Sequence, residues 1–427
     1  MSRKLIDTLM KNDKKGVFKQ EPAPLIGYTT GFPVIDYANG YVVNVPDLKN
    51  PGKIADRWVN SGFFSGQFIM FIGNAGTGKT SFAIAAGSNI VRPFNEGLFI
   101  HIDGEHSSSL QRVMAVNGWD ITEMEDKYKM MELDYVEDVY ELIVKLSEIK
   151  LSDPIYRYDT GHLDEFGRKI FALQPTVILI DSLPSLQTKE SLDKSGNIKS
   201  EMEGQTYNMR LAIAYNSFYK KLRPVIHRAN IIVFAINHIK DKPEVGFNKT
   251  QAKIQYLKTS ESIPGGSGPI YLSQTLLRFI YKGKLDLKDD GFDGYLVAVQ
   301  SVKSKTNRSD RTVQLVFNYD TGFSKWLTML KLAKDVGLIQ GRNPYCYFKS
   351  APDFKFSTKD VATIETNETL HELIVRETTP ILSYMLTDTN RPENDPNKEM
   401  NMANFTNMLD ESYDKLTDVE QDVKAEF

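Results

Sequence analysis

The stretch of sequence that decides the fold is the run Gly73-Asn74-Ala75-Gly76-Thr77-Gly78-Lys79-Thr80. It matches the pattern G-x-x-x-x-G-K-[ST] in full, and it lies between an apolar run, residues 67–72, and a stretch with helical character, residues 80–91. Glycines at these positions let backbone N–H groups close around phosphates, and the N-terminus of the following helix adds a partial positive charge. A glycine-rich turn that arose by chance would not need a strand before it and a helix after it. The run therefore predicts a phosphate-binding loop.

The residues of this loop each have an expected task. We expect the backbone from Gly73 to Gly78, together with Lys79, Thr80 and Ser81, to bind ATP. Lys79 would reach the β- and γ-phosphates, and the Thr80 hydroxyl would ligate Mg²⁺. The metal also needs a carboxylate on a neighbouring strand, and the apolar run Val177-Ile178-Leu179-Ile180 ends in Asp181. A lone acid at a strand end is more often a turn or cap residue, but the upstream loop favours Mg²⁺ as the partner of Asp181.

Four short, nearly continuous apolar runs alternate with helical stretches. They cover residues 67–72, 97–102, 176–180 and 230–236. Each run is rich in Ile, Val and Phe and ends in a polar cluster, which is typical of parallel strands buried on both faces. With helices expected at residues 80–91 and 209–227, the pattern predicts an α/β sheet. Residues 275–281 and 295–302 are expected to form a hairpin that extends this sheet at one edge.

Composition divides the chain into four segments. Residues 1–25 are basic and polar and are expected to form an N-terminal arm that takes part in polymerisation, and residues 26–330 are expected to form the α/β core. Residues 331–389 are expected to form a small C-terminal α+β domain, mostly helical after the aromatic patch at residues 345–348. Residues 390–427 are polar and acidic and are expected to be a tail.

The bulk composition is that of a globular protein, with 427 residues of which 41% are hydrophobic and 25% charged. The single cysteine, Cys346, cannot form an intramolecular disulfide, which favours a reducing, cytoplasmic location. The N-terminus has basic residues without an apolar run behind them, so no signal peptide is expected, and the apolar runs are too short to span a membrane. The formal net charge of −3 excludes neither acidic nor basic partners.

Two further strand ends carry polar residues that suit ATP hydrolysis. The second apolar run closes with His101-Ile102-Asp103-Gly104-Glu105-His106, and we expect Glu105 to activate the attacking water. Asp103, Glu105 and His106 are also open to interpretation as a metal cluster, although no further His or Cys spacing supports it. The last apolar run is followed by His238, which is expected to face the γ-phosphate, with plain strand termination as the alternative.

These elements, in this order and spacing, resemble the recombinase branch of the RecA-type ATPases. The segment DGEH resembles the family's strand with the catalytic glutamate, and VILIDSLPSL resembles its Walker B segment. Two later segments are especially similar to the bacteriophage UvsX recombinases: Ile263-Pro264-Gly265-Gly266-Ser267-Gly268-Pro269-Ile270-Tyr271 and Val302-Lys303-Ser304-Lys305-Thr306. The resemblance covers roughly residues 25–340 and is weaker over the rest of the chain.

The resemblance implies that two basic residues on a late strand reach the ATP of an adjacent protomer, and Lys303 and Lys305 match these positions. Side chains two residues apart share one face of a strand, so both can point at one phosphate. Without the resemblance, a solvated basic edge strand would be the ordinary interpretation. The sensor position is commonly glutamine in bacterial relatives and is His238 here. The family's adenine-stacking tyrosine has no clear match, and the candidates are Leu110, Arg112 and Val113.

The resemblance also implies two DNA-binding loops, which by position are residues 187–207 and 240–268. The second combines lysines that neutralise phosphates with aromatic side chains that stack between bases, as suits single-stranded DNA. The residues expected to bind DNA are Lys240, Lys242, Phe247, Lys249, Lys253, Tyr256, Lys258, Gly265 and Gly266. A lysine-rich stretch is more often a solvated loop, but its attachment to the strand of His238 favours DNA.

Taken together, the resemblance implies an ATP-dependent DNA recombinase that binds single- and double-stranded DNA as a head-to-tail helical filament. Single-strand-binding and mediator proteins are the further partners it implies, and no membrane contact is expected. If the protein is viral, its location would be the cytoplasm of the host cell. Two alternatives stay open: a hexameric RecA-fold DNA helicase and a non-catalytic recombinase paralogue. The acidic tail is either a solubilising end or a mimic of DNA that competes for the basic loops.

Overall fold

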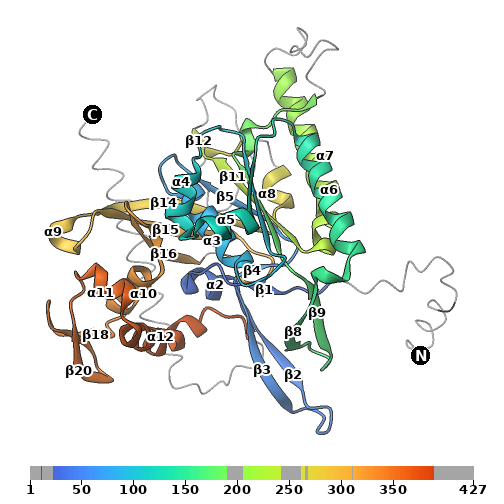
Figure 1. Cartoon of the computed structure of the whole chain (residues 1–427). Helices are drawn as coiled ribbons and strands as arrows, with labels where there is room; N and C mark the ends of the chain where they lie inside the picture. The colour runs from blue at the N-terminus through green and yellow to red at the C-terminus, as the bar shows by residue number, and fades with distance from the viewer. Residues whose placement is uncertain are drawn as a thin grey trace, which may run out of the picture.

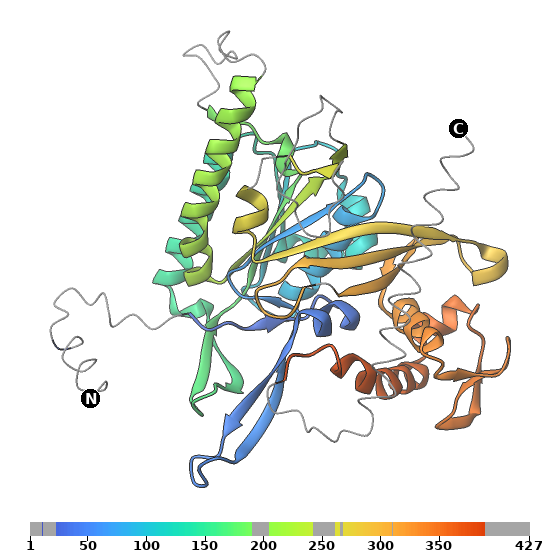
Figure 2. The same ribbon diagram turned by 180° about the vertical axis from the view of Figure 1, so that it is seen from behind.

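The structure, a computed structural model, describes residues 11, 23–189, 205–241, 261–264, 268–309 and 311–388. Within these residues a nine-stranded sheet runs through the middle of the molecule, with helices on both of its faces (Figure 1, Figure 2). The order across the sheet is β17 (Gly322–Ser324), β16 (Thr312–Asn318), β15 (Gly294–Lys303), β14 (Thr275–Leu285), β5 (Phe68–Gly73), β11 (Ile231–His238), β10 (Thr176–Asp181), β6 (Leu98–Asp103) and β7 (Tyr128–Met131). The predicted fold class, a mostly parallel α/β sheet around a phosphate loop, is confirmed.

The four apolar runs of the sequence form β5, β6, β10 and β11, which lie next to one another and run parallel. They are apolar throughout because both faces of these strands are covered. Asp181 of β10 lies opposite Asp103 of β6, and His238 of β11 lies opposite Gly73 of β5. The register therefore gathers the polar ends of these strands at one edge of the sheet.

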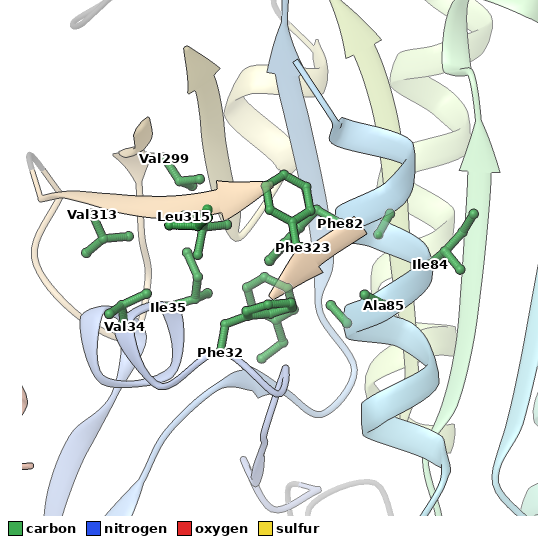
Figure 3. Packing of buried hydrophobic residues seen from close by; sticks show 14 of the residues in the cluster. Phe32, Val34, Ile35, Phe82, Ile84, Ala85, Val299, Val313, Leu315 and Phe323 are labelled. Atoms are coloured by element: carbon green, nitrogen blue, oxygen red, sulfur yellow. The ribbon is translucent and has the colours of Figure 1, made fainter. Parts of the chain in front are cut away.

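Alternate residues of β5 face two separate hydrophobic clusters. Phe71 packs with Phe82 of α3 (Lys79–Val91), with ring centroids 5.5 Å apart, on the face that also carries α2 (Pro33–Asn39). Phe68 packs at 4.9 Å against Tyr219 of α7 (Gln205–Ala229), and α6 (Val136–Ser152) lies beside α7 on that face (Figure 2). Phe82 packs against Phe32 and Phe323, with ring centroids 5.6 and 6.0 Å away (Figure 3), so these aromatic contacts hold α3, which begins at the phosphate loop.

The expected hairpin exists, but it is not at the edge of the sheet. β14 and β15 pair antiparallel as predicted, and their connection carries the short helix α9 (Leu287–Asp290). β16 and β17 continue the sheet beyond β15, which corrects the prediction. The alternation of residues 312–318, with Val313 and Leu315 buried, is the signal that was missed.

Two hairpins outside the sheet were not expected from the sequence. β2 (Tyr41–Pro46) pairs with β3 (Ile54–Asn60), and β8 (Arg157–Leu163) pairs with β9 (Lys169–Leu173). Both project from the same end of the molecule (Figure 1). The Trp58 ring stacks on His162 at 4.1 Å, and its Nε1 donates a hydrogen bond to the Leu163 carbonyl at 2.9 Å, so the hairpins support each other.

The C-terminal part begins with α10 (Lys325–Asp335) and a three-stranded sheet, followed by α11 (Val361–Thr366) and α12 (Glu368–Ser383). The strands are β18 (Ile339–Gln340), β19 (Cys346–Phe348) and β20 (Ala351–Phe356). An α+β segment, mostly helical after the aromatic patch, was expected: the patch forms β19, with Phe348 buried, and after it β20 precedes the helices α11 and α12. The predicted boundary at residue 330 falls inside α10, and the division into domains stays a prediction. No helix in the described ranges is long and apolar enough to cross a membrane.

Candidate functional site

The phosphate loop adopts backbone conformations that require glycine. Gly73, Gly76 and Gly78 have φ of 154°, 75° and 80°, where side chains are disfavoured. A Cβ on Gly73 would lie 2.4 Å from the Phe279 carbonyl oxygen, and one on Gly78 would lie 2.8 Å from the Phe323 ring. β14 and β17 therefore press against this loop, and only backbone fits there.

Lys79 is the first residue of α3 and is only 5% exposed. Its Nζ donates hydrogen bonds to the carbonyls of Gly73 at 3.1 Å and Asn74 at 2.7 Å. Burial lowers the pKa of Lys79 to about 8, while the nearby Asp181 and Glu105 carboxylates act in the opposite direction. A phosphate would replace the two carbonyls with a stronger partner, so this lysine is ready to bind an anion.

Thr80 and Asp181, the two residues expected to hold Mg²⁺, are in direct contact. The Thr80 hydroxyl donates to Asp181 Oδ2 at 2.8 Å, and Asp181 is 4% exposed at the end of β10. Burial raises the pKa of Asp181 to about 6, helped by the Glu105 and Asp103 carboxylates and opposed by the Thr80 hydrogen bond and by Lys79. A hydroxyl and a carboxylate are hard oxygen donors that fit Mg²⁺, which would relieve the charge crowded at this edge.

Glu105 lies beside His238. The distance from Glu105 Oε1 to His238 Nε2 is 3.4 Å, and the two side chains are 39% and 33% exposed. The backbone N–H groups of Gly104 and Glu105 donate to the Asp181 carbonyl at 2.8 and 3.3 Å, so the end of β10 holds this loop. A carboxylate and an imidazole thus lie side by side at the same sheet edge as the phosphate loop.

The open interpretation of residues 103–106 as a metal cluster gains no support. Among the residues that the structure describes, no three His, Cys, Asp or Glu side chains are grouped to hold a metal ion. His106 instead lies 3.8 Å from the carboxylates of Glu132 and Asp134.

The chain that leaves His238 is tied to the phosphate loop. Ile239 N–H donates to the Gly73 carbonyl at 3.4 Å, the same oxygen that Lys79 contacts. β12 (Lys240–Asp241) then pairs with β13 (Glu261–Ser262), and Asn237 Nδ2 donates to the Pro264 carbonyl at 3.0 Å. The described residues on either side of positions 242–260 are therefore attached to the sheet edge that carries the phosphate loop.

Most of the residues predicted to bind DNA lie outside the described residues. These are Lys242, Phe247, Lys249, Lys253, Tyr256, Lys258, Gly265 and Gly266. The backbone of Lys240 is part of β12. The first DNA loop beyond Lys189 up to residue 204, nearly all of the N-terminal arm and the acidic tail also fall outside.

Lys303, at the end of β15, does not reach the phosphate loop of its own chain. Its Nζ donates to the carbonyls of Ile270 at 2.8 Å and Tyr271 at 2.7 Å, near the end of α8 (Gly268–Leu272). Lys303 pairs with Leu276 of β14, which in turn pairs with Met70 of β5. Met70 comes three residues before Gly73, where the phosphate loop begins. Burial, then Lys305 and Arg223, lower the pKa of Lys303 to about 8. Lys305 is exposed.

Known proteins were compared with the whole sequence. A family model described as "ATPase: KaiC" matches residues 53–211. Protein RecA of Aquifex aeolicus (strain VF5) is 23% identical over 278 residues, and Protein RecA of Aquifex pyrophilus is 24% identical over 279 residues. Each alignment covers 65% of this chain and 66% of the relative, so the chain spans slightly less than two thirds of their length. Protein RecA of Streptococcus uberis (strain ATCC BAA-854 / 0140J) is 23% identical over 65% of this chain and 62% of that protein.

These matches support a RecA-type P-loop ATPase. The matched region contains the phosphate loop, Glu105 and Asp181, the residues that the geometry brings to one sheet edge. Nucleotide binding is what such relatives imply for this edge.

Several residues at this sheet edge were not predicted from the sequence. Asp103 and His101 are buried under the Glu105 loop, and Tyr295 and Phe323 lie against Gly78. The spacing of His101 and Asp103, two residues apart on an apolar strand, was an available signal. Among the three adenine candidates, Val113 is fully buried in the core, which leaves Leu110 and Arg112 at the surface.

Proposed function

We propose that this chain is an ATP-dependent DNA recombinase that forms head-to-tail filaments on single-stranded DNA and catalyses homologous pairing and strand exchange. The observation that carries the proposal is that Ile239, next to His238, donates to the Gly73 carbonyl, and that β12 and β13 pair on either side of the lysine-rich sequence 242–260. This connection supports a nucleotide-dependent change in a DNA-binding loop. The similarity of residues 263–271 and 302–306 to bacteriophage UvsX recombinases supports recombination in particular, in the cytoplasm of the host cell if the protein is viral.

In the proposed mechanism, the ATP phosphates bind at the loop from Gly73 to Ser81. Lys79 exchanges the Gly73 and Asn74 carbonyls for phosphate oxygens, and Thr80 and Asp181 would hold Mg²⁺, which neutralises phosphate charge. Glu105 orients the attacking water as general base. His238, next to Glu105, senses the γ-phosphate and passes the signal to Ile239 and β12.

Lys303 and Lys305 are proposed to act on the ATP of the neighbouring protomer. The hydrogen bonds of Lys303 to α8 support this role, because they place its ammonium group away from the phosphate loop of the same chain. If Lys303 left α8 to bind a phosphate on the neighbouring protomer, α8 would lose two hydrogen bonds. Because α8 follows the second proposed DNA loop, this change could be transmitted to that loop. Lys303 would then couple filament assembly, ATP binding and DNA binding.

ATP hydrolysis with and without single-stranded DNA, alongside negative-stain images of the same mixtures, tests the proposal. We expect DNA-stimulated turnover and open filaments when ATP is present. Lys79→Ala should abolish ATP binding or turnover, and Lys303→Ala should retain ATP binding but lose most DNA-stimulated turnover. Normal turnover in the Lys303 variant would refute the role in trans.

The same measurements separate the alternatives. Closed rings with strand-displacement activity would identify a hexameric helicase, and DNA binding without any turnover would identify a non-catalytic paralogue. A monomer that ignores oligonucleotides in the presence of a non-hydrolysable triphosphate would overturn the proposed function and leave a P-loop ATPase.

A further inference from the structure

A buried polar chain lies directly beneath the loop that carries Glu105. His101 and Asp103 are 0% and 3% exposed, and they point to the same face of β6 because they are two residues apart. His101 Nδ1 is 2.8 Å from the Tyr128 hydroxyl of the neighbouring strand β7. Asp103 Oδ2 accepts a hydrogen bond from the Ser108 backbone N–H at 2.8 Å. This group of polar residues therefore reaches from Tyr128 on the edge strand β7 to Ser108, after the loop that carries Glu105.

Two atoms in this chain have no hydrogen-bond partner among the described residues: His101 Nε2 and Asp103 Oδ1. Buried polar groups are nearly always hydrogen-bonded, to protein or to ordered water, because leaving one unpaired is costly. No hydrogen bond joins these two side chains directly, although the Asp103 carboxylate is close enough to influence the pKa of His101. Each of these two buried atoms therefore needs a further hydrogen-bond partner.

The protonation states make the two atoms complementary. Burial lowers the pKa of His101 to about 4, so its ring is neutral at physiological pH and carries one N–H. Burial and the Asp103 carboxylate raise the pKa of Tyr128, which keeps its hydroxyl protonated and able to donate to His101 Nδ1. The ring hydrogen is then on Nε2, so the atom of His101 without a partner is a donor, and the atom of Asp103 without a partner is an acceptor.

We propose that a buried water molecule bridges His101 Nε2 and Asp103 Oδ1, and that Tyr128, His101 and Asp103 are positioning residues for Glu105. The water accepts from the imidazole N–H and donates to the carboxylate, which completes an unbroken chain from Tyr128 to Ser108. Asp103 and Ser108 enclose the residues Gly104 to Ser107, and the Asp181 carbonyl holds the same loop from the other side. Fixed at both sides, the Glu105 carboxylate keeps one position relative to the phosphate loop. The catalytic part of this inference rests on the proposed role of Glu105 in ATP hydrolysis.

The experiment compares full-length variants that break the chain at different points. Asp103→Ala and His101→Phe remove the acceptor and the donor, and Tyr128→Phe removes one hydroxyl. Asp103→Asn keeps the shape of the side chain and the acceptor for the Ser108 N–H. Ile102→Val is the matched control, since Ile102 lies between His101 and Asp103 in the sequence but packs on the opposite face of β6. Backbone amide exchange of residues 104–109 is measured without nucleotide, together with KM and kcat for ATP.

We expect Asp103→Ala and His101→Phe to speed amide exchange in this loop about tenfold or more and to lower kcat by roughly 10- to 100-fold, with KM changed much less. Tyr128→Phe should cause a smaller loss, and Asp103→Asn should restore most of the amide protection. Ile102→Val should behave as wild type.

The inference would be overturned if Asp103→Ala and His101→Phe both showed the same amide exchange, kcat and KM as Ile102→Val. A crystal structure in which His101 contacts Asp103 directly, or in which the gap between them is empty, would also overturn it. If the wild-type protein did not hydrolyse ATP, the proposed function would fail, while amide exchange without nucleotide would still decide whether this chain holds the loop.

Discussion

Two buried lysines show how single residues set the electrostatics of this protein. Lys79 lies among carboxylates at the phosphate edge, whereas Lys150, near the end of α6, is 3% exposed and donates to neutral acceptors. These acceptors are the Gln174 carbonyl at 2.8 Å, the Thr176 hydroxyl at 2.9 Å and the Asn230 carbonyl at 3.0 Å. The Lys150 amino group thus links the end of α6 to residues that follow β9 and α7. Burial lowers the pKa of Lys150 to about 7.

Lys150 is expected to make the free energy of unfolding depend on pH. Its folded pKa of about 7 is below its ordinary value of 10.5, so the unfolded chain binds more protons between these values and stability rises with pH there. The contribution is up to about 1.4 kcal/mol per pH unit. Denaturant unfolding of wild type and Lys150→Met at pH 7.5, 8.5 and 9.5 measures it, because other groups titrate equally in both. Parallel pH profiles for the two proteins would contradict this prediction.

At the scale of secondary-structure elements, the important unit is the stem formed by β12 and β13. Glu261 of β13 forms an ion pair at 2.7 Å with Arg278 of β14, and the two side chains are 11% and 15% exposed. Arg278 is also in register with Ile72, one residue before the phosphate loop. The stem is therefore attached to the strand that borders the nucleotide site.

Arg278→Met should loosen this stem, because it leaves the mostly buried Glu261 carboxylate without its arginine. We expect a stability loss of about 1–3 kcal/mol and a clear fall in the ratio of DNA-stimulated to unstimulated turnover. Arg92→Met is the matched control, since the Arg92–Glu123 pair is more exposed and should contribute less than about 1 kcal/mol. If DNA stimulated turnover equally in Arg278→Met and Arg92→Met, the stem would have no part in the response to DNA.

At the scale of the whole molecule, the sheet separates two halves of one proposed ATP site. The phosphate loop follows the end of β5, whereas Lys303 is in register with the earlier residue Met70 and is held by α8. Under the proposed function, a chain with complementary halves at separate places would assemble head to tail, with each interface using one half from each copy.

Mixing two inactive variants tests this arrangement. Lys79→Ala lacks the phosphate-binding half and Lys303→Ala lacks the other, so a random equal mixture should regain roughly a quarter of wild-type turnover, the share of interfaces that combine two intact halves. A mixture of Lys79→Ala with Asp181→Ala is the control, because both changes damage the same half. Turnover no higher than the sum of the separate variants would place both halves in one chain.

Much of this protein could be predicted from short-range sequence patterns. The glycines at positions 73, 76 and 78 and the apolar runs were sufficient to predict a glycine-rich loop between a strand and a helix and the parallel strands. The strands β18 and β19 were not predicted because they have only two and three residues, too few to show alternation.

By itself, the sequence determined the local elements and the phosphate loop, since strand burial, helix starts and glycine conformations depend on neighbours within a few residues. Only the tertiary structure decided which distant residues meet: His238 beside Glu105, Lys303 on α8, and Tyr128 beside His101. The reason is physical. Register and strand order arise from contacts between residues far apart in the chain, and local periodicity contains no record of them.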